Sequence, residues 1–222
     1  MRLNRAVRFA LLLALVAFLM LAMMGCGDFF VSENAIDHVD VTPPGVLLKT
    51  GDMVSLSASA VQVGGTSSVI TSSADWTTSS AATATVDNSS TKGQVTAGST
   101  AGTVTITAKD TTSNVSGTST VVVTTSTLPT ELSIRAASSL IPLNQTVKFQ
   151  AVAVLSGSEI DVSNIVTWTS DNSAVATVDK TGNVTGLAAC GPLQGNLCPS
   201  ISASLATATS TITGKQQIAT VQ

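Results

Sequence analysis

The chain has 222 residues, of which 10% are charged and 3% are aromatic, and its formal net charge at pH 7 is −3. After the N-terminal segment the basic residues form no patch or run, which argues against nucleic-acid binding. After the N-terminal segment, Thr, Ser, Val and Ala alternate with turn-forming residues, as is typical of an all-β exported protein. Long Ser/Thr tracts would also suit a disordered linker, but the recurrent Val/Ile alternation favours strands.

The N-terminal segment has the parts of a secretory signal. Arg2, Arg5 and Arg8 precede an unbroken apolar run from Phe9 to Met24, and the small residue Gly25 follows. The run is shorter than the ~20 residues needed to cross a bilayer core, so a permanent transmembrane helix is the weaker alternative. Loss of the three arginines with the signal would leave 7 of the 10 basic residues against 13 acidic ones, a net charge of −6.

The end of this segment resembles a bacterial lipoprotein signal. Met23-Met24-Gly25-Cys26 is similar to the lipobox, although Leu is more usual at its first position. The resemblance implies a signal peptide over residues 1–25, acyl chains such as palmitate on Cys26, and a lipidated tether over 26–35. An ordinary secretory signal with an incidental Cys is the alternative. Gly27 rather than Asp follows the Cys, which favours the outer over the inner membrane in the lipoprotein sorting pattern.

A repeat organises the rest of the chain. Trp76-Thr-Thr-Ser-Ser-Ala-Ala-Thr-Ala-Thr-Val-Asp87 and Trp168-Thr-Ser-Asp-Asn-Ser-Ala-Val-Ala-Thr-Val-Asp179 are offset by 92 residues at both ends. We therefore predict two copies of one domain, each about 90 residues long and able to bury its own core. The predicted parts are domain 1 (36–124), a linker (125–130) and domain 2 (131–222).

Short strands separated by turns are predicted within each copy. Val104 and Ile106 alternate with threonines, which is the period of a half-buried strand. About seven such strands predict a β-sandwich, so the fold class is all-β with two tandem immunoglobulin-like sandwiches. Pro129 restricts the linker and favours an extended rod over a collapsed pair. The strands expected in domain 1 are 37–42, 53–63, 74–79, 82–86, 93–97, 103–109 and 116–124. At the end of domain 2 we expect strands at 200–205 and 207–213, with 216–221 as an alternative for the last one.

The order of motifs resembles the bacterial Ig-like domain of group 2. In this family, such domains serve as spacers or binding modules in invasin-like and intimin-like adhesins and other surface proteins, so the resemblance implies a sandwich fold and no catalytic residues. The stretches that carry it in the first copy are Val39 to Val41, Gly51 to Leu56, Trp76 to Ser79, Ala84 to Asp87, Gly93 to Gly98 and Gly102 to Ala108. Those in the second copy are Leu132 to Ile134, Thr146 to Phe149, Trp168 to Ser170, Ala176 to Asp179 and Gly182 to Gly186.

The second copy departs from the family pattern at an inserted loop. Cys190 and Cys198 bound this loop, and in an exported chain they predict a disulfide that clamps it locally. A metal site would need further ligands, and the only His, His38, lies in the other copy. Loops on a rigid sandwich carry recognition, so we expect any binding surface here. Its candidate residues are Gly191, Pro192, Leu193, Gln194, Gly195, Asn196 and Leu197.

The remaining candidate side chains have structural explanations. Trp76, Phe149 and Trp168 are predicted to be core aromatics, with a sugar-stacking platform as the alternative. Asp87 and Asp179 end strands before turn residues, so turn capping explains them, whereas calcium would need several clustered oxygen donors.

We expect neither a cofactor, nor a metal, nor catalysis, because a single His and no Gly-x-Ser-x-Gly segment support no nucleophilic triad. The expected protein is a non-enzymatic, lipid-anchored envelope protein that acts as a spacer or an adhesion module. Its partners would be the membrane and an envelope protein or glycan. A carbohydrate-binding module and an accessory subunit of an envelope enzyme remain the alternatives.

Overall fold

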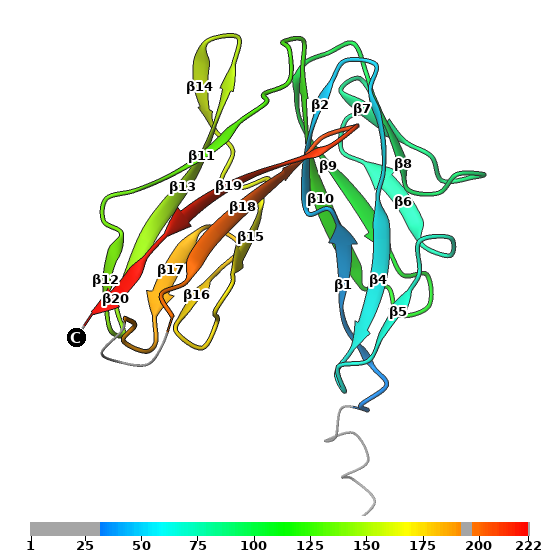
Figure 1. Ribbon diagram of the computed structural model, residues 1–222. Helices are drawn as coiled ribbons and strands as arrows, with labels where there is room; N and C mark the ends of the chain where they lie inside the picture. Colours follow the sequence, from blue (N-terminus) through cyan, green and yellow to red (C-terminus); the bar gives the residue numbers. More distant parts are fainter. Residues whose placement is uncertain (1–31, 192–196, 222) are drawn as a thin grey trace, which may run out of the picture.

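The computed structural model describes residues 32–191 and 197–221, and these residues form strands and turns without a helix. The strands build two β-sandwiches, each around its own hydrophobic core (Figure 1). The fold class predicted from the alternation of apolar and hydroxyl-bearing residues is therefore confirmed.

The first sandwich consists of three groups of paired strands. One is β1-β4-β5, a second is β3-β8-β7, and the third is β2-β10-β9-β6. Most pairs are antiparallel, but β2 and β10 are parallel. The strands are β1 (Ile36–Thr42), β2 (Gly45–Lys49), β3 (Met53–Ser55), β4 (Ser57–Gln62), β5 (Ser67–Val69), β6 (Asp75–Thr78), β7 (Ala84–Val86), β8 (Gln94–Ala97), β9 (Gly102–Lys109) and β10 (Ser116–Thr124).

The second sandwich repeats these pairings. Pair β15-β18 corresponds to β6-β9, and the parallel pair β12-β20 corresponds to β2-β10. The strands are β11 (Leu132–Ala136), β12 (Leu140–Pro142), β13 (Thr146–Leu155), β14 (Ser158–Asp161), β15 (Thr167–Ser170), β16 (Ala176–Val178), β17 (Asn183–Gly186), β18 (Ser200–Ala206), β19 (Thr211–Gln217) and β20 (Ala219–Val221).

The expected strands of the first copy are present, with the run 53–63 divided into β3 and β4. The end of the second copy differs from the expectation. Thr207 does not begin a strand, because its backbone N–H donates to the Ser210 carbonyl across a turn at 2.8 Å. The final strands are therefore β19 and β20. The strand expected at 207–213 is wrong in its start, because β19 begins at Thr211. The alternative at 216–221 overlaps the end of β19 and contains β20.

Strand β2, which is absent from the strands expected above, belongs to both sandwiches. Its residues Val46, Leu47 and Leu48 are fully buried. Successive side chains of a strand point to opposite faces. Val46 and Leu48 accordingly lie in the core of the first sandwich, and Leu47 lies in the core of the second.

A continuous sheet therefore crosses from one sandwich to the other. Ala206 of β18 pairs with Val46 of β2 in parallel, which gives the strand order β15-β18-β2-β10-β9-β6. The backbones also approach closely here, because a Cβ on Gly45 would lie 2.4 Å from the Cα of Ile165. Val122 of β10 and Leu128 of the linker pack against the second core as well.

The two sandwiches lie side by side in a V rather than end to end (Figure 1). The extended rod expected from the linker is wrong. The physical reason is that a strand with apolar side chains on both faces cannot bury all of them in one core, so the second sandwich packs on the face that carries Leu47.

This arrangement brings the two chain ends to the same end of the molecule. The first described residues, which lead into β1, lie at the open end of the V, and so do β12 and β20 (Figure 1). The connection from β10 to β11 lies at the opposite end, where the two sandwiches meet (Figure 1).

Candidate functional site

The inserted loop of the second sandwich is closed by a disulfide. Cys190 and Cys198 are bonded, with their Cα atoms 5.0 Å apart, as the sequence predicts. Of the candidate binding residues, Gly191 and Leu197 are described, and Leu197 is 84% exposed. Residues 192–196 lie outside the described part of the chain, so the proposed binding role of this loop stays a prediction.

Backbone hydrogen bonds hold both ends of the loop against the sandwich. The Cys190 N–H donates to the Thr220 carbonyl at 3.2 Å, and the Thr220 hydroxyl donates to the Ala188 carbonyl. On the other side, the Asn172 amide donates to the Leu197 carbonyl at 3.3 Å. The first end of the loop is therefore bonded to β20 and the second end to the segment between β15 and β16.

The aromatic residues of the described part of the chain are buried. Trp76, Phe149 and Trp168 are 2%, 0% and 8% exposed. The indole N–H of Trp76 donates to the Thr71 carbonyl at 2.9 Å, and that of Trp168 donates to the Ser163 carbonyl at 3.0 Å. These side chains build cores and present no stacking platform for a sugar ring.

The carboxylates of Asp87 and Asp179 accept hydrogen bonds from residues of their own turns. Asp87 accepts hydrogen bonds from the N–H groups of Ser89 and Thr91 at 2.6 and 2.9 Å, and from their hydroxyls. The hydrogen bonds from Ser89 come first among the causes that lower the pKa of Asp87 strongly. Asp179 accepts corresponding bonds from Thr181 and Asn183, and its pKa is lowered in the same way, chiefly by Asn183. Turn capping thus accounts for both residues.

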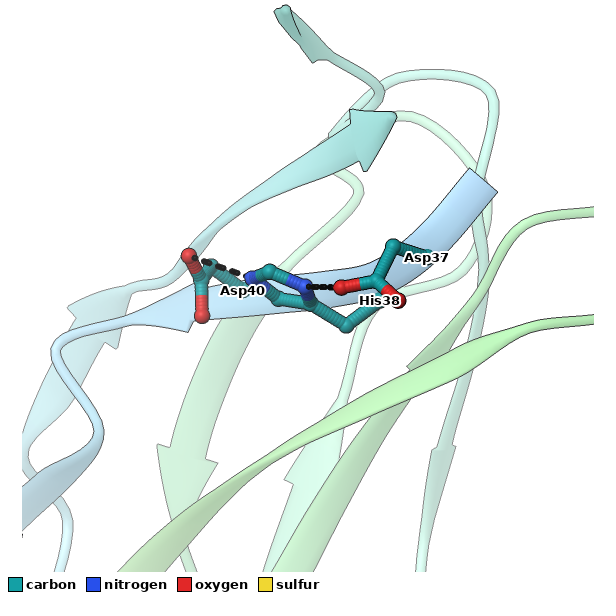
Figure 2. Close-up of polar contacts among 3 residues, drawn as sticks. All are labelled: Asp37, His38 and Asp40. Atoms are coloured by element: carbon teal, nitrogen blue, oxygen red, sulfur yellow. Dashed lines mark hydrogen bonds and ion pairs between the residues drawn. The ribbon is translucent and has the colours of Figure 1, made fainter. Parts of the chain in front are cut away.

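One polar cluster on β1 stands apart from the cores and turns. Figure 2 shows the His38 ring between two carboxylates, with Nδ1 2.8 Å from Asp37 and Nε2 3.4 Å from Asp40. The hydrogen bond to Asp37 and the charge of Asp40 raise the pKa of His38. The three side chains are about half exposed or more.

A β-bulge makes this cluster. His38 and Asp40 share a face of β1 because they are two residues apart, whereas Asp37 would ordinarily point to the other face. The register of β1 against β4 shifts between Ile36 and His38, which lets Asp37 approach the ring. The spacing of His38 and Asp40 was visible in the sequence, but the bulge was not.

Within the described residues, the hydrogen bonds and ion pairs of the His38 ring are those to Asp37 and Asp40. A His between two carboxylates is a base without a neighbouring nucleophile, and no Ser, Thr or Cys in the described residues hydrogen-bonds to the ring. Across residues 32–191 and 197–221, no group of three or more His, Cys, Asp or Glu side chains is arranged to hold a metal ion.

The proposed anchor lies outside the described residues. Cys26 and the signal over 1–25 fall there, so lipidation of Cys26 stays a prediction. Within the described part of the chain, no helix is long and apolar enough to cross a membrane.

Comparison with known proteins finds a family match within the second sandwich. Residues 130–190 match the bacterial Ig-like domain (group 2). The chain is also 34% identical over 155 residues to ice-binding protein 1 of Shewanella frigidimarina, a match that covers 69% of this chain and 17% of the relative. The chain thus spans about a sixth of that relative's length.

Solved structures with a similar arrangement of strands are distant. Domains 5–6 of the S-layer protein SbsC match with a TM-score of 0.35 and 18% identity, over 85% of this chain and 98% of that one. Human protocadherin-24 EC1-2 matches with a TM-score of 0.28 and 12% identity, over 84% and 99% of the two chains. Likenesses this remote carry no argument about function.

Proposed function

We propose that the protein is a non-catalytic envelope protein, held to the outer membrane by lipid on Cys26, whose paired Ig-like sandwiches form a rigid interaction or adhesion module. The first sandwich is taken to belong to the same family as the second, since the strand pairings of the two correspond. The module would present its surfaces to an envelope protein or a glycan.

The observation that carries the proposal is the sheet shared through β2. Two independent sandwiches on a flexible linker would change their relative orientation freely. Here Leu47 is buried in the second core while its neighbours fill the first, so we expect the pair to move as one body. A rigid β-scaffold of this kind holds its loops in fixed positions, which suits recognition.

A fractionation experiment tests the anchor. The full chain with Cys26→Ser should leave the membrane fraction, and mass spectrometry should find no acyl chain at its N-terminus. The matched control replaces Cys190 and Cys198 with Ser and should stay in the membrane fraction. Membrane retention of the Cys26→Ser variant would contradict a lipid anchor and would revive the transmembrane alternative.

Cross-linking with mass spectrometry in the native envelope tests the interaction role. We expect cross-links from this chain to another envelope protein or to cell-wall material. Co-purification with an enzyme would instead favour the role of an accessory subunit. If lysines across both sandwiches cross-link only within the chain, the spacer role would remain and the interaction role would be lost.

Recognition of ice is a second candidate, because one observation favours it. The name of the Shewanella relative describes ice binding by that protein. In this chain Thr77, Thr107 and Thr118 lie opposite one another on β6, β9 and β10 and form a row of hydroxyl and methyl groups across the sheet. Partitioning of the chain into a growing ice front tests the idea. A Thr107→Lys variant should be excluded from the ice if this row binds it, and equal exclusion of both chains would remove this candidate.

A further inference from the structure

The end of the second sandwich that lies at the open end of the V exposes several large apolar side chains. We call Leu140, Leu187, Leu197 and Val221 the apolar end. Their exposed fractions are 56%, 47%, 84% and 38%. Exposed apolar residues that gather at one place mark an interaction surface, whereas single ones are normal.

Backbone hydrogen bonds show that these residues lie on neighbouring segments. The Leu143 N–H donates to the Val221 carbonyl at 2.9 Å, and the Asn144 N–H donates to the Gly186 carbonyl at 2.8 Å. Leu140 itself pairs with Ala219 in the β12-β20 ladder. The disulfide and the Thr220 hydrogen bond described above attach the segment next to Leu197 to the same place. The four residues therefore lie on adjoining segments at one end of the second sandwich.

The segments that build the apolar end carry no charged side chain. No charged residue occurs between Arg135 and Lys148, between Lys180 and Lys215, or after Lys215. The hydrogen bonds place one charged side chain next to this surface, Asp171, whose carboxylate accepts the Ser200 N–H at 2.8 Å. Insertion of the apolar end into a less polar phase would therefore desolvate few charges.

The first sandwich differs at the same end of the molecule. The chain enters it through Glu33, and β1 begins with the half-exposed Asp37 and His38. Burial of these groups in an apolar phase would be costly. The apolar end is thus a property of the second sandwich and not of the fold that both sandwiches share.

We infer that the apolar end inserts into the interfacial layer of the bilayer that holds the lipid anchor. This inference rests on the proposed lipidation of Cys26. A lipidated Cys26 would be joined to Ser32, the first described residue, by a segment whose greatest span is about 20 Å at 3.3–3.6 Å per residue. The end of the first sandwich that leads into β1 must then stay close to the membrane, and the apolar end lies at the same end of the molecule, on the other arm of the V (Figure 1).

The bilayer suits this surface better than a protein groove. Apolar side chains at an interface enter the boundary between headgroups and acyl chains to a depth of about 5–10 Å, where backbone polar groups can stay hydrated. A second point of contact strengthens a lipid anchor. It would also fix the orientation of the protein, with the junction of the two sandwiches pointing away from the membrane.

Quenching by brominated lipid tests the inference on the lipidated full chain in phosphatidylcholine vesicles. Leu140→Trp and, separately, Leu197→Trp place a fluorophore at the apolar end. The matched control is Val154→Trp, which replaces a residue that is 50% exposed on β13 beside β14, at the other end of the same sandwich (Figure 1). We expect bromines near the headgroups to quench the added Trp at positions 140 and 197 and to leave that at position 154 unchanged.

The outcomes separate this inference from the proposed function. Acyl chains found at Cys26, together with equal quenching at positions 140, 197 and 154, would overturn the insertion and leave the anchor intact. Absence of the acyl chains would instead overturn the anchor. A dimer by light scattering in which position 140 is shielded from lipid would mean that a second copy covers the apolar end, which also overturns the inference.

A polar variant provides a second measurement. Leu187→Ser combined with Leu197→Ser, introduced into the Leu140→Trp chain, should abolish the quenching at position 140. Both replaced side chains are exposed, so the fold should persist, and the thermal unfolding midpoint checks this. Undiminished quenching in this variant would contradict insertion through the apolar end.

Discussion

At the scale of single residues, each of the two copies packs a glycine against its buried Trp ring. Gly182 has φ +87, and a Cβ there would lie 2.7 Å from the Phe149 carbonyl oxygen and 2.9 Å from Cζ2 of Trp168. Gly93 occupies the same relation to Trp76 in the first copy. A glycine is needed at these positions both for its backbone conformation and for the space that its missing side chain leaves to the ring.

We therefore predict that Gly182→Ala is more destabilising than a left-handed conformation alone would explain. The control is Gly157→Ala, because Gly157 has φ +85 but nothing within 4 Å of an added Cβ. The control should cost about 1 kcal/mol of unfolding free energy from backbone strain, and Gly182→Ala should cost about 1–3 kcal/mol more because it also overpacks the ring. Urea unfolding of both variants measures the difference, and equal costs would show that the ring adapts.

The carboxylates of Asp87 and Asp179, which cap their turns, should make the stability of the protein depend on pH. Hydrogen bonds hold the pKa of Asp87 and of Asp179 far below the ordinary value of about 3.9. A group whose pKa is lowered on folding stabilises the protein above its unfolded pKa, and this contribution is lost as the pH falls towards the folded pKa. Below about pH 4 the wild type should therefore lose stability progressively.

The Asp87→Ala, Asp179→Ala double variant tests this dependence. It should be less stable than the wild type at neutral pH, and its unfolding midpoint should fall less between about pH 5 and pH 2, because neither carboxylate remains to be protonated. Thermal unfolding followed by circular dichroism at a series of pH values measures both effects. Parallel midpoint curves for the two chains would show that other acidic groups dominate acid unfolding.

At the scale of elements, β2 decides how the sandwiches are joined. It is a short strand whose residues from Gly45 to Leu48 are all buried, which is unusual for a strand that one would expect at the edge of a sandwich. Its two faces serve two cores, and its backbone pairs with β10 on one side and with Ala206 of β18 on the other. The junction is therefore continuous in both packing and hydrogen bonding.

Truncation of neighbouring residues on β2 should weaken different sandwiches. Leu47→Ala and Leu48→Ala each remove a fully buried side chain and should each cost about 2–5 kcal/mol. Hydrogen exchange should accelerate first in β13 and β18 for Leu47→Ala, and in β6 and β9 for Leu48→Ala. The same pattern of exchange in both variants would show that the two cores do not respond separately.

The disulfide is an element-level clamp rather than the basis of the fold. Replacement of both Cys190 and Cys198 by Ser should lower the unfolding free energy by about 2–3 kcal/mol, since the bond closes only a short loop. Exchange should rise in β20 and in the loop, because Thr220 bonds to Cys190 through its N–H as well as its carbonyl. Loss of structure throughout the chain would contradict a local role.

At the scale of the whole molecule, the V shape predicts a compact particle in solution. Two sandwiches in a rod, each about 35–40 Å long from strands of this length, would extend over roughly 70–80 Å. Small-angle X-ray scattering should give a shorter maximum dimension for the wild type. Gly-Ser residues inserted between Thr125 and Thr130 should leave it unchanged, because the shared sheet and not the linker holds the V, whereas Leu47→Asp should open it.

Much of each sandwich could be predicted from local patterns. The alternation in β9, the repeated Trp-to-Asp segments and the Cys pair each depend on residues close together in the sequence, and the structure bears out the strands and the disulfide that they predict. Strand β2 escaped prediction because a short apolar run without alternation does not reveal which faces it will bury. The cluster around His38 could not be predicted, because the bulge that brings Asp37 to the ring depends on the pairing of β1 with β4.

By itself, the sequence determined the all-β class, the strands that alternate, the buried aromatics and the partner of each cysteine in the described residues, because these follow from side-chain period, apolar character and short separations along the chain. Only the tertiary structure decided that the two sandwiches share a sheet and fold back into a V. The reason is that Leu47 is buried in a core with residues more than a hundred positions away in the sequence, such as Leu205 and Ile201. That long-range packing also carries the apolar end of the second sandwich to the end of the molecule from which the proposed anchor would extend.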